Sequence, residues 1–88
     1  MFYVYVLKSV RDGELYIGST NNLRTRASLH NNGKVLSTKR RSPFTLIYYE
    51  AYTAEGDARH RESNLKSRGQ ARRQLLGRIS GGLLRGQS

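Results

Sequence analysis

Cysteine and tryptophan are absent from this 88-residue chain, and proline and methionine occur once each. Without cysteine the chain forms neither disulfide bonds nor a thiolate metal site, which fits a reducing compartment. Long hydrophobic runs are also missing, because the apolar stretch from Phe2 to Leu7 is interrupted at Lys8. That stretch is too short for the apolar region of a signal peptide or for a membrane span. We therefore expect a cytoplasmic protein that does not enter a membrane.

Acidic residues are scarce, and this scarcity leaves a large charge of one sign. Six Asp and Glu residues stand against sixteen Lys and Arg, which gives a formal net charge of +10. Twelve of the sixteen are arginine, whose side chain binds phosphate bidentately and stacks on bases. The charge therefore favours a nucleic-acid partner, with a ribosome-associated or merely basic protein as the alternative.

The length of the chain limits it to a single domain. A chain of this size buries roughly 60% of the surface that it exposes when unfolded, which supports about one layer of helices on a sheet. We expect this domain to span residues 1–80 and a flexible C-terminal tail to span residues 81–88.

Two runs near the N-terminus predict a β-hairpin. Residues 2–9 (FYVYVLKS) and 15–19 (LYIGS) are rich in aromatic and β-branched residues. Asp12-Gly13, between them, is a common tight-turn signal. These runs are the first two expected strands.

Alternation along these strands sorts their side chains onto two faces. Tyr3, Tyr5 and Leu7 share one face of the first strand, while Tyr16 and Gly18 share one face of the second. If the register places Tyr5 beside Tyr16, both phenols project from the same side of the sheet. The spacing leaves that register open.

The segment TNNLRTRASLHNNGK predicts a helix. Thr20 or Asn21 can cap its N-terminus, and the Asn-Asn-Gly run can end it. Arg26 and His30 lie four residues apart, so their side chains fall on adjoining turns.

The remaining chain predicts a loop, a third strand and two further helices. Residues 34–43 form a basic loop, and residues 44–52 (FTLIYYEAY) are apolar enough for a central strand. A helix is expected between a Thr53 cap and a Gly69 stop, followed by a short amphipathic helix over 70–79. The order β-β-α-β-α-α predicts an α+β fold, a three-stranded antiparallel sheet flanked by helices.

The second expected helix carries a carboxylate on its inward face. Ala58, Glu62 and Leu65 lie along one stripe of it. An ordinary i,i+4 ion pair of Glu62 with Lys66 is the alternative to a functional role.

Four segments together resemble the GIY-YIG nuclease superfamily: YVY at 3–5, YIG at 16–18, NLRTRASLH at 22–30 and DARHRESNLK at 57–66. They occur in the right order, and the resemblance spans residues 2 to about 79. It is closest to the small single-domain members, which consist of the catalytic module alone. Tyr3 stands where the family name has glycine, a position that varies widely in such proteins. The resemblance implies the same three-stranded sheet flanked by helices.

The resemblance also implies a set of site residues. Tyr5 matches the tyrosine of the first motif, and Tyr16 matches the first tyrosine of the second. Arg26 matches the helix arginine, His30 the histidine four residues beyond it, and Glu62 the metal-binding glutamate.

Two further positions bear on this assignment. Gly18 matches the glycine of the second motif, where the missing side chain lets backbone or substrate approach closely. Arg24 is a rival for the arginine role, but only Arg26 has the four-residue spacing to His30.

The implied chemistry is hydrolysis of a phosphodiester. Glu62 would hold one Mg²⁺ or Mn²⁺, since such ions take one or two carboxylates plus the substrate phosphate. Arg26 would clamp the scissile phosphate. We assign Tyr5 as the base, with Tyr16 and His30 positioning water and phosphate, although the division of roles among these three stays open.

We therefore expect a metal-dependent endonuclease that cleaves DNA and leaves 5′-phosphate and 3′-hydroxyl ends. A non-catalytic nucleic-acid-binding module with the same fold is the alternative, and a protein-interaction domain a weaker one. Glu62 favours the enzyme, because a carboxylate repels phosphate unless a cation intervenes. A lone catalytic module lacks the extra domains that give larger relatives their targets, so a partner protein is one source of target choice. The residues expected to contact the nucleic-acid backbone are Lys39, Arg40, Arg41, Arg72 and Arg73.

Overall fold

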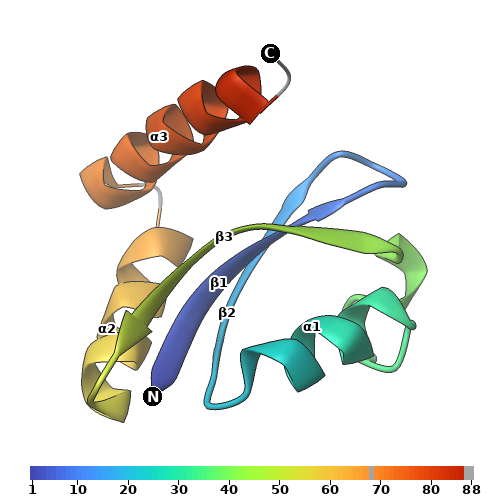
Figure 1. The fold of residues 1–88 in the computed structure, drawn as a ribbon, viewed down its shortest axis with the longest axis horizontal. Coiled ribbons are helices and arrows are strands. Elements are labelled where there is room, and N and C mark those ends of the chain that lie inside the picture. The colour runs from blue at the N-terminus through green and yellow to red at the C-terminus, as the bar shows by residue number, and fades with distance from the viewer. Residues whose placement is uncertain (68, 87–88) are drawn as a thin grey trace.

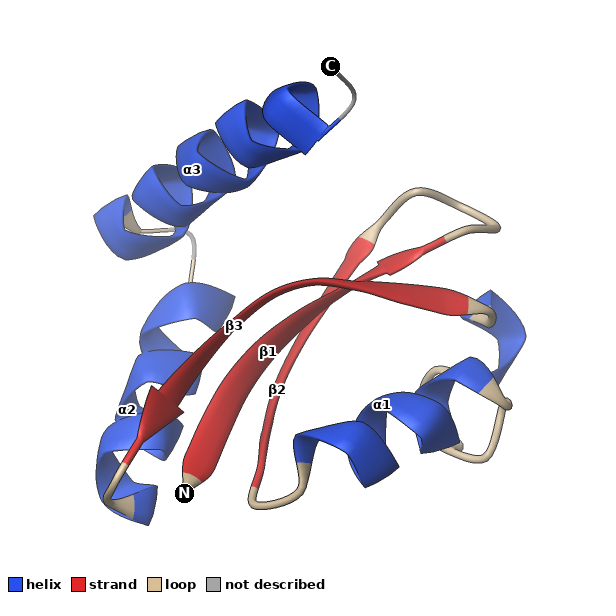
Figure 2. Cartoon of the chain, in the orientation of Figure 1, coloured by secondary structure: helices blue, strands red, loops and turns tan. Residues whose placement is uncertain are grey.

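A computed structural model describes residues 1–67 and 69–86 of the chain, with side chains up to residue 79. Figure 1 shows a three-stranded sheet with helices on both sides, and Figure 2 separates these elements from the loops. This arrangement confirms the predicted α+β class and element order. The elements are β1 (Phe2–Ser9), β2 (Leu15–Thr20), α1 (Leu23–Asn31), the 3₁₀ turn η1 (Lys39–Arg41), β3 (Phe44–Tyr52), α2 (Glu55–Lys66) and α3 (Gln70–Gly86).

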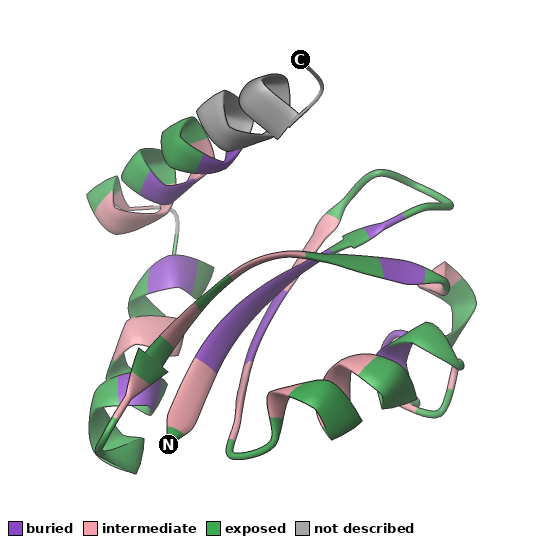
Figure 3. Ribbon diagram, viewed as in Figure 1, coloured by how far each residue is buried: buried purple, intermediate pink, exposed green. Residues whose placement is uncertain are grey.

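The sheet has the order β2-β1-β3, with both pairings antiparallel. The prediction that residues 44–52 form the central strand is therefore wrong, since β1 lies between the other two. The reason is visible in burial: four consecutive residues of β1, Val4 to Leu7, are buried on both faces, whereas most of β3 is exposed or half-buried (Figure 3). An apolar run alone does not distinguish a central strand from an edge strand.

Two apolar clusters cover the two faces of the sheet. Val4, Val6 and Ile17 pack against Leu65 of α2 and Leu75 of α3. On the other face Tyr5, Leu7 and Phe44 pack together, with Tyr16 and Leu23 beside them. The alternation of β1 therefore divides the molecule into an α2/α3 side and an α1 side, each with its own cluster.

Several predicted boundaries are wrong. Asn22, rather than Thr20 or Asn21, caps α1, with its Oδ1 accepting the Thr25 N–H at 3.1 Å. Thr20 forms the turn before the cap, since its Oγ1 accepts the Asn22 N–H at 3.1 Å. At the other end α1 terminates at the predicted Asn-Asn-Gly run, where Gly33 has a φ of +69°.

The later helices also depart from their predicted ends. Ala54, rather than Thr53, precedes α2, and no side chain caps it. The helix ends at Lys66, before the predicted stop at Gly69, whose carbonyl instead accepts the Arg73 N–H at 3.3 Å. Helix α3 continues to Gly86, past the predicted end at residue 79 and into the predicted tail, while residues 87–88 of that tail lie outside the described residues.

A half-buried polar cluster fastens β3 to α2. Arg61 donates from Nε and Nη2 to the two carboxylate oxygens of Glu50, at 2.9 and 3.0 Å. The hydroxyls of Tyr48 and Tyr52 donate to the same carboxylate, at 2.5 and 2.6 Å. Burial alone would raise the pKa of Glu50, but these donors lower it to about 2. The bidentate pair holds Arg61, and with it the neighbouring Glu62, in a fixed position against the sheet.

Along the described residues no helix combines the length and apolarity that crossing a membrane requires.

Candidate active site

A chain of hydrogen bonds runs inward from Tyr5 on the α1 side of the sheet. The Tyr5 hydroxyl lies 3.0 Å from His30 Nε2, and His30 Nδ1 lies 2.8 Å from Thr38 Oγ1. All three residues are at most 1% exposed. Thr38 Oγ1 also points at the Val35 carbonyl, at 3.5 Å, so its proton is directed away from the ring. We assign His30 Nδ1 as the donor to Thr38, which leaves Nε2 free to accept the Tyr5 proton.

The protonation state of His30 agrees with this direction. Burial, and secondarily the positive charge of Arg26, lower the pKa of His30 from 6.5 to about 4. The imidazole is therefore neutral at pH 7 and has a lone pair facing Tyr5.

Tyr5 is held in its protonated form by its surroundings. Burial raises the pKa of Tyr5, and the nearby Tyr16 and Glu62 raise it further, while Arg26 acts in the opposite direction. A phenol of this kind does not ionise alone at pH 7, but it can donate its proton to an acceptor such as His30 as it receives another. The predicted role of Tyr5 as base therefore depends on His30.

The register left open by the spacing places both tyrosines on the α1 side. Tyr5 pairs directly with Gly18, and Leu7 pairs with Tyr16. The ring centroids of Tyr5 and Tyr16 are 6.4 Å apart, and those of Tyr16 and His30 are 4.8 Å apart. The Tyr16 ring therefore lies next to both the Tyr5 and the His30 rings.

Gly18 makes room for the Tyr5 ring. A Cβ atom added at Gly18 would lie 2.5 Å from the Tyr5 hydroxyl oxygen and 2.7 Å from Tyr5 Cζ. Real Cβ atoms essentially never come so close to another heavy atom. The group that approaches this glycine is therefore the tyrosine of the site itself, rather than backbone or substrate.

Glu62 reaches the end of β2 from α2. Its Oε1 accepts the Ser19 hydroxyl at 2.6 Å, and its Oε2 pairs with Lys66 Nζ at 2.6 Å. Burial would raise the pKa of Glu62, but hydrogen bonds from Lys66 and Ser19 and the charge of Arg59 lower it overall. The side chain is 20% exposed, so this carboxylate is both ionised and accessible.

The donor set fits a hard divalent cation. Such an ion keeps several waters and takes one or two carboxylates together with substrate phosphate. No three His, Asp or Glu side chains gather into a metal cluster within the part of the chain that is described. An ion at Glu62 would displace the Lys66 ammonium from Oε2, and that lysine is 52% exposed and free to move aside.

A cleft of about 300 Å³ is lined by residues that act on these groups. It lies between the end of β2, the start of α1 and the first turns of α2. Arg26 lines it, as do Ser19, the partner of Glu62, and Arg59. Arg26 also lies close enough to shift the pKa of Tyr5 and of His30. The cleft therefore holds Arg26, which acts on the Tyr5–His30 pair, together with Arg59, whose charge acts on Glu62, and two arginines in one cleft suit a phosphate group.

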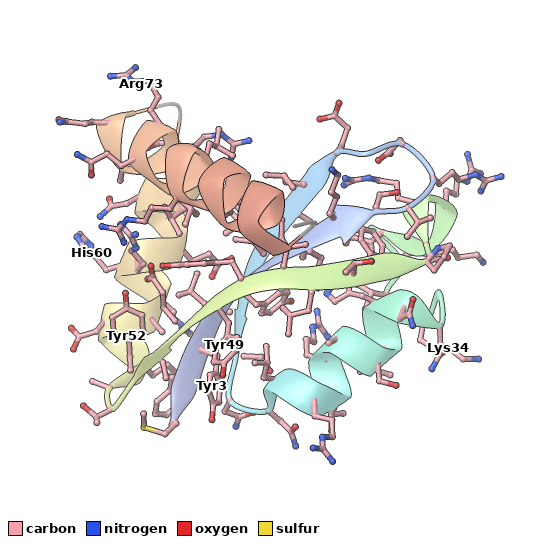
Figure 4. All side chains as sticks on the ribbon, turned by 45° about the horizontal axis from the view of Figure 1, so that its top comes forward. Tyr3, Lys34, Tyr49, Tyr52, His60 and Arg73 are labelled. Atoms are coloured by element: carbon pink, nitrogen blue, oxygen red, sulfur yellow. The ribbon has the colours of Figure 1, made fainter. Side chains whose placement is uncertain are left out.

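The structure does not bring together the five basic residues predicted to contact the nucleic-acid backbone. Lys39 and Arg40 are exposed on η1, whereas Arg41 pairs with Asp12 at 3.1 Å. Arg72 donates to a backbone carbonyl at the end of α2, at 3.1 Å. Arg73 projects from the start of α3, at the opposite end of the view from α1 (Figure 4).

Sequence reasoning missed three residues of the site. Ser19 directly follows the Tyr-Ile-Gly motif, and Arg59 lies three residues before Glu62, so motif context could have indicated both. Thr38 reaches His30 through the loop after α1, where no spacing rule indicates a partner.

Comparisons with known proteins agree with this geometry. The family model described as "GIY-YIG catalytic domain" matches residues 1–75. A UPF0213 protein of Staphylococcus haemolyticus is 39% identical over 66 residues, which cover 74% of this chain and 79% of that protein. A UPF0213 protein of Clostridium perfringens is 43% identical over 67 residues, which cover 75% and 71%. The solution NMR structure of a UPF0213 protein from Bacillus halodurans has a TM-score of 0.55 and 31% identity, with 93% of this chain and 88% of that chain covered.

Proposed function

Since the chain belongs to the GIY-YIG catalytic domain family, a family of nucleases, we propose that it is a metal-dependent endonuclease that hydrolyses phosphodiester bonds in DNA. One observation carries this proposal: Arg26 lines a cleft and acts on the pKa of a hydrogen-bonded tyrosine–histidine pair, and Ser19 in the same cleft donates to the carboxylate of Glu62. We further propose that it works in the cytoplasm, with a partner protein as one source of target choice.

The residues of the site divide the reaction among them. Arg26 binds the scissile phosphate and offsets the charge that develops on it. The water oxygen bonds to phosphorus as the bond from phosphorus to the 3′ oxygen breaks. The water proton passes to the Tyr5 hydroxyl as the Tyr5 proton passes to His30 Nε2, and the 3′ oxygen takes up a proton from solvent. The products carry 5′-phosphate and 3′-hydroxyl ends.

Binding of the phosphate also prepares His30 to accept that proton. The charge of Arg26 is one of the two causes of the low pKa of His30. A phosphate on Arg26 neutralises that charge, so the basicity of His30 rises once substrate is present.

Glu62 is the residue that would hold the divalent ion. When bound there, Mg²⁺ or Mn²⁺ would supply charge neutralisation for the phosphoryl oxygens and would acidify a bound water. The low pKa of Glu62 keeps the carboxylate available for this at neutral pH.

A non-catalytic nucleic-acid-binding module is the second candidate. The observation that favours it is the 2.6 Å pair between Glu62 and Lys66, which is also the geometry of an ordinary helix ion pair. The two functions differ in the role of Glu62: a nuclease needs this carboxylate for cleavage, whereas a binding module has no need of it.

The test is cleavage of labelled single-stranded, duplex, flapped and branched DNA, and of RNA, with Mg²⁺, Mn²⁺ or EDTA. Arg26→Ala is expected to abolish cleavage, while Lys34→Ala removes an equal charge from an exposed site far from the cleft and should cleave like wild type (Figure 4). If both variants lose cleavage equally, the effect is one of general charge. If wild type binds the substrates but cleaves none of them, the binding module is favoured.

A further inference from the structure

A second hollow, of about 570 Å³, opens on the α1 side of the sheet, next to the cleft. We call it the Tyr49 groove. Strands β1 and β3 form one wall of it and the first turns of α1 form the other. The lining residues used below are Tyr3, Tyr49, Leu46, Asn21, Asn22 and Arg24.

The groove presents an aromatic face to solvent. Tyr49 is 55% exposed, and Leu46 beside it is 37% exposed. The Tyr3 ring lies edge-on to Tyr49, with centroids 6.1 Å apart and an angle of 65° between planes (Figure 4). This contact braces the Tyr49 ring and leaves it open to a planar group.

Tyr49 differs from the tyrosines on either side of it in the strand. Tyr48 and Tyr52 donate their hydroxyls to Glu50 on the α2 side of the sheet. Tyr49 points to the α1 side and is the direct cross-strand partner of Tyr5. An exposed ring on the strand that pairs with β1 at Tyr5 contributes little to the core and is open to a ligand.

The groove and the cleft share a lining residue. Asn21 lines both of them, at the junction between β2 and α1. The charged side chain at the groove is Arg24, and none of its described lining residues is acidic. A chain that enters the cleft with a phosphate at Arg26 therefore meets a positive, aromatic surface as it leaves.

We propose that the Tyr49 groove binds an unpaired nucleobase of the substrate strand, stacked on Tyr49, next to the phosphate held in the cleft. The inference rests on the proposed nuclease function and extends it to a substrate class: strands with an unpaired base beside the scissile bond. A base in a duplex has both faces covered by its neighbours and cannot stack on a side chain. The Asn21 side-chain amide and the Nδ2 group of Asn22, whose Oδ1 caps α1, offer hydrogen bonds to base edges, and stacking itself tolerates any base.

Base stacking is measured directly with a short single-stranded oligodeoxynucleotide that contains 2-aminopurine, in EDTA so that no strand is cut. Wild type should quench the fluorescence of the single strand and leave a duplex of the same sequence unchanged. Tyr49→Phe keeps the aromatic face and should behave like wild type. Tyr49→Leu keeps apolar bulk without that face, and it should lose the quenching and roughly 5- to 150-fold in affinity, the range that base–aromatic stacking gives.

Leu36→Ala is the control, because Leu36 is 88% exposed on the loop after α1 and does not line the groove. Undiminished quenching by Tyr49→Leu would overturn the proposal, as would self-association of wild type that Tyr49→Leu abolishes, because the groove would then hold a second copy of the chain. The proposed function fails separately. If wild type cleaves and Tyr49→Leu stacks normally, only the groove is wrong. If wild type cleaves no substrate but stacking depends on Tyr49, the base-binding groove is supported and the nuclease function is refuted.

Discussion

The burial of His30 predicts a specific pH dependence of folding. The folded protein lowers the pKa of this imidazole from 6.5 to about 4, through burial and the charge of Arg26. In the unfolded chain neither cause operates. Between these two values the unfolded chain binds more protons than the folded one, so the free energy of unfolding falls as pH falls through this window.

The size of the effect follows from the shift. A difference of one bound proton changes stability by about 1.4 kcal/mol per pH unit. Lowering the pH from 7 to 4.5 should therefore cost about 2 kcal/mol through His30 alone. Glu50 does not contribute to the change between pH 7 and pH 4.5. Its pKa is about 2 despite burial, because Arg61 and two phenols bind it, so its stabilising effect is lost only below pH 4.5.

Urea unfolding at pH 7 and pH 4.5 measures the loss. His30→Gln, which cannot titrate, should lose about 2 kcal/mol less than wild type between the two pH values. His60→Gln removes the other histidine, which is exposed on α2, and should retain the full wild-type loss (Figure 4). An equal loss in His30→Gln and wild type would refute the reasoning, as would an NMR titration of His30 in the folded protein with a midpoint near 6.5.

Three further substitutions test other contacts of the site. Gly18→Ala should lower stability by about 1–3 kcal/mol and slow cleavage, because its Cβ would lie 2.5 Å from the Tyr5 hydroxyl oxygen; thermal unfolding at the wild-type temperature would contradict this. Thr38→Val removes the hydroxyl 2.8 Å from His30 Nδ1 and should slow cleavage and shift its pH profile, with rescue by Thr38→Ser; an unchanged profile would show that the hydroxyl does not set the tautomer. Lys66→Met frees a carboxylate oxygen and should lower the Mn²⁺ concentration for half-maximal activity by about two- to fivefold; an unchanged or higher requirement would argue against metal binding there.

Local patterns predicted the elements that carry the site. Alternation in β1 and β2 placed Tyr5 with Tyr3, and Tyr16 with Gly18, because the side-chain period of a strand depends on the strand alone. The four-residue spacing of Arg26 and His30 predicted adjoining turns for the same reason. These inferences needed no knowledge of what lies across the sheet.

Features that depend on distant partners escaped prediction. Strand β1, not β3, is central, because which strand pairs along both of its edges depends on the whole sheet. The register that sets Tyr5 opposite Gly18 is likewise a property of two strands together. Thr38 became the partner of His30 through loop closure, and the pair between Glu62 and Ser19 joins residues 43 positions apart. Contacts of this kind follow from the assembled fold.

We propose that Glu62 serves cleavage rather than folding or binding. The most direct measurement compares wild type with Glu62→Gln, which keeps the size of the side chain and an oxygen for the Ser19 hydroxyl. Cleavage is measured with Mg²⁺ or Mn²⁺, and binding of the same DNA is measured in EDTA, where no ion offsets the carboxylate. We predict that Glu62→Gln binds DNA at least as tightly as wild type, since a negative charge is removed, and cleaves it at least a hundredfold more slowly, about 2.7 kcal/mol in the barrier. Cleavage at the wild-type rate by Glu62→Gln, with its metal dependence intact, would contradict this role of Glu62.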